Sequence, residues 1–151
     1  MWLIRPATAA DETAIRDCAT AAYSKYITAI GRKPAPMTAD YAAHIARGEV
    51  HVAVDESGTL LGYIVCFSEG KSMQLENVAV LPSAAGQGIG KALVKLCEDE
   101  ACRRGHPVVQ LYTNEKMTEN IAIYPHLGYR ETERRTEDGF KRVFFEKWLG
   151  D

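Results

Sequence analysis

The stretch VAVLPSAAGQGIGK, residues 78 to 91, contains the pattern that decides the fold. Its apolar beginning predicts a strand, and from Ile89 to Arg104 apolar side chains recur at the spacing of a helix. Three glycines, Gly86, Gly88 and Gly90, lie where the strand gives way to the helix. Backbone N–H groups there can close on an anion without obstruction, and the helix dipole favours the same ligand. The stretch therefore predicts a site for a phosphorylated ligand.

Length and composition are those of an ordinary globular protein. The 151 residues are 46% hydrophobic and 25% charged, with a formal net charge of −2, which predicts a single domain over residues 1–151. Scattered Lys and Arg in a net acidic chain argue against nucleic acid as a partner. We expect no membrane partner, because no apolar stretch approaches the roughly 20 residues that cross a bilayer and the N-terminus has no signal-peptide pattern.

The cysteines and histidines predict no metal site. The four cysteines form no C-x-x-C pair, and the four histidines have no metal-ligand spacing. Unpaired thiols are typical of a reducing compartment, so we expect a cytoplasmic protein. The cysteines are Cys18, Cys66, Cys97 and Cys102.

Periodicity predicts an α+β (α/β) domain with a mixed, largely antiparallel sheet. Strands are expected over Trp2–Arg5, Val50–Val54, Leu60–Phe67, Met73–Leu81, Val108–Tyr112, Tyr129–Arg135 and Phe140–Trp148. Helices are expected from a Thr8 cap with Asp11 through Tyr26, from a Thr38 cap to Gly48, from Ile89 to Arg104, and over Ile121–Leu127. Because a helix joins Met73–Leu81 to Val108–Tyr112, these two strands are expected to lie parallel.

Two common phosphate motifs do not fit the glycines. A P-loop requires a glycine where Ala85 stands and a hydroxyl where Ala92 stands. A dinucleotide fingerprint requires a third glycine where Lys91 stands. A tight turn that binds no ligand is the plainer alternative.

The glycine stretch resembles the signature of the GCN5-related N-acetyltransferase family, [Arg/Gln]-x-x-Gly-x-[Gly/Ala] after an apolar strand and a proline. Gly88-Ile89-Gly90 matches its core, and Ala85 departs from its first position. A second segment, Asn120 to Tyr129, resembles the family's late pattern Asn-x-x-Ala-x-x-x-Tyr-x-x-x-Gly-[Phe/Tyr], shortened by one residue. The resemblance spans nearly the whole chain. It implies a six- to seven-stranded sheet with about four helices and a central pair of parallel strands that splay apart.

The resemblance also implies acetyl-coenzyme A as donor and an amine of a small molecule or peptide as acceptor. Glycine-rich N–H groups would hold the pyrophosphate, with Gln87 or Lys91 replacing the Arg or Gln lost at Ala85. The strand backbone would pair with the pantetheine arm and donate to the thioester carbonyl. The cofactor residues implied are Val78, Ala79, Val80, Gly86, Gln87, Gly88, Ile89, Gly90, Lys91, Asn120 and Tyr124.

For catalysis, the resemblance implies that Tyr124 protonates the leaving thiolate; the alternative is a core tyrosine with a satisfied hydroxyl. We expect Glu76 to act as the base, through water; the alternative is a solvated strand carboxylate. Regular alternation would place Glu76 with Val78 and Val80 on one face. For Asn120 the alternative is a helix N-cap.

The acceptor is expected to contact the early helices and their loop, Gly31 to Met37. The expected lining residues are Tyr23, Tyr26, Met37 and Asn114; the alternatives are core aromatics and, for Asn114, a turn. A non-catalytic acyl-coenzyme A sensor is the competing function. A nucleotide-triphosphate binder lacks a lysine–hydroxyl pair here. The resemblance also makes a homodimer a possible state.

Overall fold

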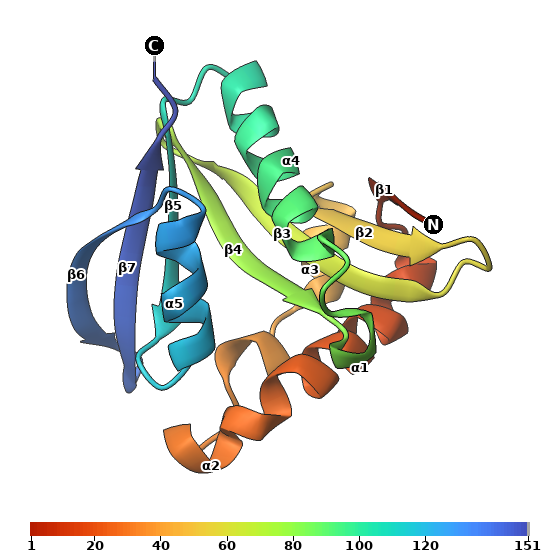
Figure 1. Ribbon diagram of the computed structural model, residues 1–151, viewed down its shortest axis with the longest axis horizontal. Coiled ribbons are helices and arrows are strands. Elements are labelled where there is room, and N and C mark those ends of the chain that lie inside the picture. Colours follow the sequence, from red (N-terminus) through yellow and green to blue (C-terminus); the bar gives the residue numbers. More distant parts are fainter. Residues whose placement is uncertain (151) are drawn as a thin grey trace.

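A computed structural model describes residues 1–150, and its seven strands form one mixed sheet (Figure 1). The spatial order is β1-β2-β3-β4-β5-β7-β6. Neighbouring strands are antiparallel except β4 and β5, which run parallel. This confirms the predicted mixed sheet with a central parallel pair. The strands are β1 (Trp2–Pro6), β2 (Val50–Asp55), β3 (Leu60–Glu69), β4 (Ser72–Val80), β5 (Val108–Asn114), β6 (Arg130–Glu137) and β7 (Phe140–Trp148).

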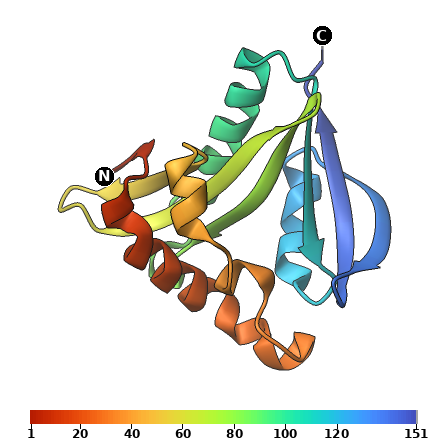
Figure 2. The same cartoon turned by 180° about the vertical axis from the view of Figure 1, so that it is seen from behind.

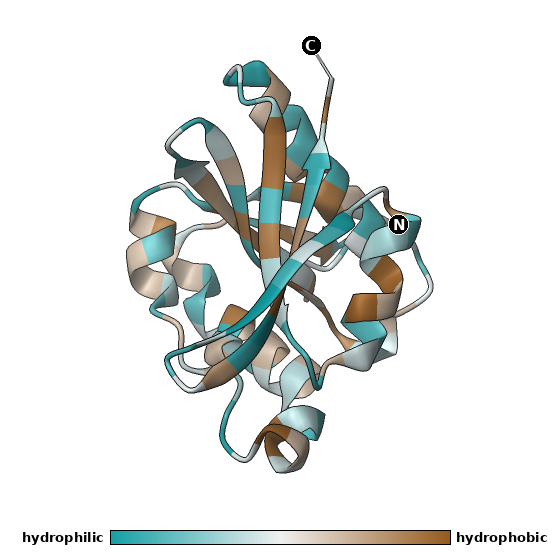
Figure 3. Ribbon diagram, turned by 90° about the vertical axis from the view of Figure 1, so that its left-hand side faces the viewer, coloured by the Kyte–Doolittle hydropathy of each residue, from teal (hydrophilic) through white to brown (hydrophobic). Residues whose placement is uncertain are grey.

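Helices cover both faces of the sheet (Figures 1 and 2). α4 (Ile89–Arg103) and α5 (Thr118–His126) pack on one face, over a cluster that includes Leu75, Leu93 and Phe145. α1 (Glu12–Tyr23) and α3 (Tyr41–Ala46) lie on the other face, over a second cluster. α2 (Ile27–Ile30) follows α1 after one 3-10 turn. The outer strand β6 is exposed over nearly its whole length and crosses the front of Figure 3 as a largely hydrophilic strand.

The two parallel strands separate after a short contact. β4 and β5 pair only at Met73 with Val109, Gln74 with Gln110 and Leu75 with Leu111. Beyond these pairs they diverge toward their C-terminal ends, as Figure 1 shows. The divergence leaves the edge of β4 without a strand partner on the β5 side, and this is where the candidate site lies.

A β-bulge in β4 corrects the predicted position of Glu76. Leu75 pairs with Cys66 of β3 and Asn77 pairs with Val65, so Glu76 has no opposite residue. The extra residue shifts the alternation of faces. Val78 packs with Leu75 in the cluster beneath α4, although regular alternation separates them. The prediction that Glu76 shares a face with Val78 and Val80 is therefore wrong.

Three element boundaries differ from the predicted ones. Asp40, not Thr38, caps α3, because its Oδ1 accepts from the N–H of Ala43 at 3.1 Å. α5 begins at Thr118 rather than Ile121, so Asn120 lies inside its first turn and is not the N-cap. β5 extends two residues further than expected, to Asn114.

The first helical segment is less regular than its spacing predicts. The Thr8–Asp11 cap forms, with the Thr8 N–H donating to Asp11 Oδ2 at 2.8 Å, but a 3-10 turn precedes α1. α1 ends at Tyr23, and Ser24–Tyr26 is again a 3-10 turn. Across residues 1–150, no helix is both long and apolar enough to span a membrane.

Candidate active site

Two cavities meet where β4 and β5 diverge. The first, here called the α3 cavity, has a volume of about 290 Å³ and is bounded by the Pro34–Asp40 segment, α3, β4, β5 and β7. The second, the α4 cavity, has a volume of about 490 Å³ and runs along the end of β4 between α4 and α5. Four residues line both cavities and form their common wall: Tyr23, Val78, Asn120 and Tyr124. The two cavities are therefore adjacent at these four residues.

The glycine turn provides unpaired N–H donors beside the α4 cavity. Gly86 and Gly88 have φ values of +85° and +81°, which L side chains rarely adopt. The N–H of Ala92 donates to Gly88 O at 3.0 Å as the first bond of α4, so the preceding helical N–H groups lack a helix acceptor. Nothing lies within 4 Å of a Cβ built on either glycine. The turn is therefore an open cradle suited to an anion.

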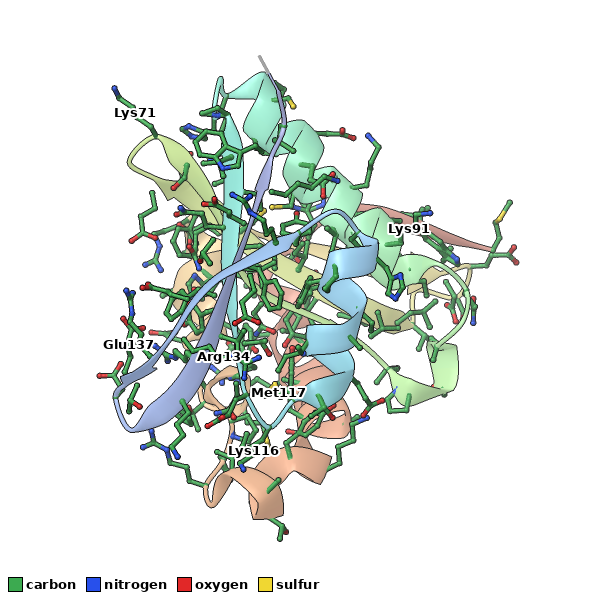
Figure 4. All side chains as sticks on the ribbon, turned by 60° about the vertical axis from the view of Figure 1, so that its left-hand side comes forward. Lys71, Lys91, Lys116, Met117, Arg134 and Glu137 are labelled. Carbon is green, nitrogen blue, oxygen red and sulfur yellow. The ribbon has the colours of Figure 1, made fainter. Side chains whose placement is uncertain are left out.

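Side chains around this turn divide between core and cavity. Ala85, Gly90 and Lys91 line the α4 cavity, and Lys91 projects from the first turn of α4 (Figure 4). The Ile89 side chain is only 1% exposed and packs in the core, so Ile89 offers a ligand only its backbone. Gly88 borders a shallower hollow on the outer side of the α4 start, together with Lys91.

The edge of β4 has backbone groups that no strand satisfies. Leu81 N–H bonds to Leu61 O of β3 at 2.8 Å, and alternate residues of an antiparallel ladder point the same way. The backbone groups of Val78 and Val80 therefore point away from β3, into the gap. The Tyr23 hydroxyl donates to Val78 O at 2.7 Å. The Val78 N–H is left as a donor at the common wall.

Tyr124 combines a buried ring with an unpaired hydroxyl. The residue is 7% exposed, and its ring centroid lies 5.9 Å from that of Tyr129 and 5.6 Å from that of Phe145. Burial raises the pKa of the Tyr124 hydroxyl to about 12. No other group in residues 1–150 forms a hydrogen bond with this hydroxyl, although the residue lines both cavities. The ring serves the core, and the hydroxyl remains available to a ligand.

The bulge residue Glu76 lines the α3 cavity. Its Oε2 accepts a hydrogen bond from the Tyr112 hydroxyl at 3.3 Å. Burial is the main cause that raises the pKa of Glu76 above its ordinary value. A carboxyl group with a raised pKa is a suitable base for proton transfer near neutral pH.

A network of buried hydroxyls and an amide fixes the wall behind the cavities. Tyr41 OH donates to Pro36 O at 2.6 Å and accepts from Asn77 Nδ2 at 2.6 Å. The same hydroxyl lies 2.8 Å from Tyr63 OH. Asn77 Oδ1 in turn lies 3.1 Å from Tyr23 OH, whose single proton is shared with the shorter bond to Val78 O. The loop beside the α3 cavity is thus tied to β3, β4 and α1.

The expected acceptor residues occupy different places. Tyr23 and Asn114 line the α3 cavity, and Asn114 Oδ1 also accepts from Lys116 N–H at 2.9 Å in a turn, while its contact with the acceptor stays a prediction. Tyr26 lines the α4 cavity instead. Met37 packs against the cluster beneath α1, while its neighbours Pro34, Ala35 and Pro36 line the α3 cavity.

Several cavity residues were missed by the sequence reasoning. Tyr112 and Arg142 follow from strand alternation, since Leu111 and Val143 face the core and their neighbours must face the opposite side. No sequence pattern indicates that Asp40 and His44 line a cavity, because their positions depend on where the short helix α3 lies. Met117, which precedes α5 in Figure 4, also lines the α3 cavity. Among the residues described, no group of three or more His, Cys, Asp or Glu side chains is arranged to hold a metal ion.

Curated relatives match about half of this chain. A mycothiol acetyltransferase of Jonesia denitrificans is 31% identical over 83 residues, which are 54% of this chain and 26% of the relative. A mycothiol acetyltransferase of Clavibacter sepedonicus is 30% identical over 80 residues, 53% of this chain and 26% of the relative. The matched region thus spans about a quarter of the length of these relatives.

Solved structures share the whole fold at low sequence identity. The PaiA N-acetyltransferase of Thermoplasma acidophilum, solved in complex with coenzyme A, has a TM-score of 0.80 at 18% identity and covers 99% of both chains. The ribosomal-protein-S18-alanine N-acetyltransferase of Escherichia coli has a TM-score of 0.77 at 22% identity, covering 100% of this chain and 96% of the other. The family model described as "Acetyltransferase (GNAT) family" matches residues 14–129. This chain belongs to the acetyltransferase (GNAT) family.

Proposed function

We propose that this protein transfers the acetyl group of acetyl-coenzyme A to a primary amine. The observation that carries the proposal is the common wall of the two cavities, since Val78 and Tyr124 line both of them. Two substrates that enter from opposite sides would meet there. Family membership and the acetyltransferases among the relatives support the same reaction.

The α4 cavity suits the donor. Its glycine turn offers main-chain N–H groups to the diphosphate, from Gly86 to Lys91, without a Cβ in the way at Gly86 or Gly88. The Ala85 N–H donates to Pro82 O at 3.3 Å, and Lys91, which lines the same cavity, would supply the cationic charge. The backbone of Val78 to Val80 would pair with the amides of the pantetheine arm, and Asn120 would contact the same arm. Bound there, acetyl-coenzyme A supplies an activated thioester at the common wall.

The transfer forms a C–N bond and breaks a C–S bond. The acceptor enters as an ammonium ion and loses two protons in all. In the overall balance the thiol keeps one proton and the solvent receives the other. Glu76, through water, would take the first proton from the ammonium, because burial raises the pKa of Glu76 toward neutrality. The Val78 N–H would stabilise charge on the carbonyl oxygen during attack. Tyr124 would donate its hydroxyl proton to the departing sulfur and regain one from solvent.

The identity of the acceptor does not follow from the relatives. The mycothiol named for two of them belongs to proteins about four times as long as the region they share with this chain. We propose that residues 1–151 act as one N-acetyltransferase domain. Its location in the cytoplasm and its assembly as a homodimer stay predictions.

The test has two parts. Isothermal titration with acetyl-coenzyme A should give saturable binding, and release of free thiol should rise when a panel of primary amines is added. Saturable binding without thiol release from any amine would favour the non-catalytic sensor. Absence of binding at millimolar concentration would reject the proposed function altogether.

A further inference from the structure

Arg142 is a half-buried cation in the wall of the α3 cavity. It lies on β7, its side chain is 11% exposed, and it lines the cavity together with Glu76. Its guanidinium carbon lies 4.2 Å from the centre of the Tyr112 ring and 5.5 Å from that of Phe140. The two rings hold the guanidinium plane in place, so little conformational entropy is lost when it binds a ligand.

Most of the donors on Arg142 are not used by the protein. A guanidinium has five N–H groups. Within residues 1–150 its one side-chain hydrogen bond runs from Nη1 to Glu137 Oε1 at 2.9 Å. Among the described residues, the one fully buried side-chain nitrogen or oxygen that lacks a hydrogen-bond partner is Nδ1 of His51, so no Arg142 nitrogen is both buried and unpaired. The remaining nitrogens of Arg142 are therefore reachable from open space.

The ion pair with Glu137 leaves room for a second anion. Glu137 divides its two oxygens between Arg142 and Arg135, whose Nη2 lies 2.9 Å from Oε2. It lines the neighbouring surface hollow and not the α3 cavity. The bidentate arrangement that a guanidinium prefers with a carboxylate is thus incomplete on Arg142.

Charges of both signs line the α3 cavity. Asp40 and Glu76 are carboxylates, His44 is engaged with Glu49 at 2.7 Å, and Arg142 is the guanidinium. A simple cationic amine would leave Arg142 without a partner for its remaining donors. A phosphate dianion would meet repulsion from two carboxylates. An acceptor with one ammonium and one carboxylate matches both signs of charge in this lining.

We propose that the acceptor is an amino acid, a primary amine that also carries a carboxylate, and that Arg142 binds this carboxylate while the amine lies toward Glu76 and Tyr124. This inference rests on the proposed function, and it adds the chemical class of the acceptor. Arg142 is then a specificity-determining residue. It takes no proton and forms no bond in the transfer.

The first experiment compares acids with their amides on the unmodified protein. Glycine, β-alanine, 4-aminobutyrate and phenylalanine cover different spacings between amine and carboxylate, and each is paired with its carboxamide. A hydrogen bond between charged groups typically tightens binding roughly tenfold or more, as measured by the dissociation constant. We therefore expect at least one acid to exceed its amide about tenfold in kcat/KM, measured as thiol release. Equal values for every pair, in a protein that turns over amines, would overturn the inference and leave the proposed function intact.

The second experiment uses Arg142→Gln with Arg135→Gln as its matched control. Arg135 also pairs with Glu137 and also lies over an aromatic ring, 4.2 Å from the centre of Phe144, but it does not line the α3 cavity. The acid-to-amide ratio should fall toward one in Arg142→Gln and stay high in Arg135→Gln. An equal fall in both variants would contradict the assignment. Arg142→Lys keeps the positive charge but lacks the planar, two-pronged set of N–H donors. It replaces Arg142→Gln in this comparison if Arg142→Gln does not fold.

If the protein turns over none of these amines, a binding measurement still tests the inference. Calorimetry with coenzyme A present would compare N-acetylated amino acids with their N-acetylated amides. Tighter binding of the acids to the unmodified protein, lost in Arg142→Lys, would support the inference. Equal binding of both would reject it, whereas failure to bind coenzyme A itself would reject the proposed function.

Discussion

At the residue scale, the proposed chemistry depends on Tyr124 and Glu76, whose pKa values burial raises above those of the same groups in water. Burial raises the pKa of Tyr124 to about 12, so its hydroxyl is a proton donor at neutral pH. Burial also raises the pKa of Glu76, which brings a carboxylate closer to the range useful for a base. Tyr124 belongs to the common wall and lies on α5, whereas Glu76 lines the α3 cavity from the bulge of β4.

Tyr124→Phe removes the proposed acid and keeps the ring that packs on Tyr129 and Phe145. Because loss of a general acid typically lowers a rate by 10² or more, kcat should fall about 100-fold while the Kd for acetyl-coenzyme A changes little. Steady-state kinetics and calorimetry measure the two quantities. Tyr129→Phe is the control, since its hydroxyl bonds to Glu98 at 2.9 Å. An unchanged kcat in Tyr124→Phe would exclude the acid role.

Glu76→Gln should lower kcat and raise stability. The folded state raises the pKa of Glu76, so it binds this proton more tightly than the unfolded chain does. Stability from this group is therefore present below the unfolded pKa and lost as pH rises through the folded value. The amide has no such dependence, so the gain in unfolding free energy should be larger at pH 8 than at pH 5, as measured by urea titration. A kcat/KM that still declines at acidic pH with the original midpoint would remove Glu76 from the base role.

At the element scale, the start of α4 and the bulge in β4 place the backbone and the carboxylate. The glycine stretch and the strand before it were predictable, because three glycines at the junction of a strand and a helix form a rare and specific pattern. The bulge was not. Leu75, Glu76 and Asn77 look like an ordinary strand, and only the pairing with Val65 and Cys66 shows that one residue is extra. Register depends on the partner strand, which a single segment does not encode.

Gly88→Ala tests the cradle. A Cβ at a φ of +81° is strained, and left-handed backbone costs an L residue about 1–2 kcal/mol. We expect that loss of stability together with weaker binding of acetyl-coenzyme A, because the turn would relax away from the geometry that aligns its N–H groups. Gly58→Ala is the matched control, with a φ of +84° in the turn between β2 and β3. Equal affinity in the two variants would argue against a backbone cradle at Gly88.

At the scale of the whole molecule, the network of buried hydroxyls and an amide joins the loop beside the α3 cavity to α1, β3 and β4. Tyr41→Phe would leave Asn77 Nδ2 without its acceptor and free the Pro34–Pro36 loop. A buried unsatisfied donor costs about 1–3 kcal/mol, so urea unfolding should show a loss in this range. Tyr26→Phe breaks a bond to Glu119, an exposed carboxylate, and should cost about 0.5 kcal/mol. Similar losses in both variants would show that the network adds nothing.

The overall architecture was more predictable than the site. Seven strands, the parallel central pair and the main helix follow from periodicity and from the crossover between β4 and β5. The α3 cavity did not follow, because its lining comes from elements distant in the chain. Asp40 caps a short helix, Tyr112 and Arg142 lie on two neighbouring strands, and Pro36 is placed by a bond to Tyr41. Strand alternation predicts the face of Tyr112 and Arg142, but no local pattern shows that their side chains line one cavity with Asp40.

The wall shared by Tyr23, Val78, Asn120 and Tyr124 has a practical consequence for inhibitor chemistry. A single compound whose amino-acid portion is tethered to pantetheine could fill both hollows at once. Tethering makes the second engagement intramolecular, with an effective concentration in the millimolar range for a short linker. Because the same four residues line both hollows, the two portions of such a compound would lie side by side, and a short tether would join them.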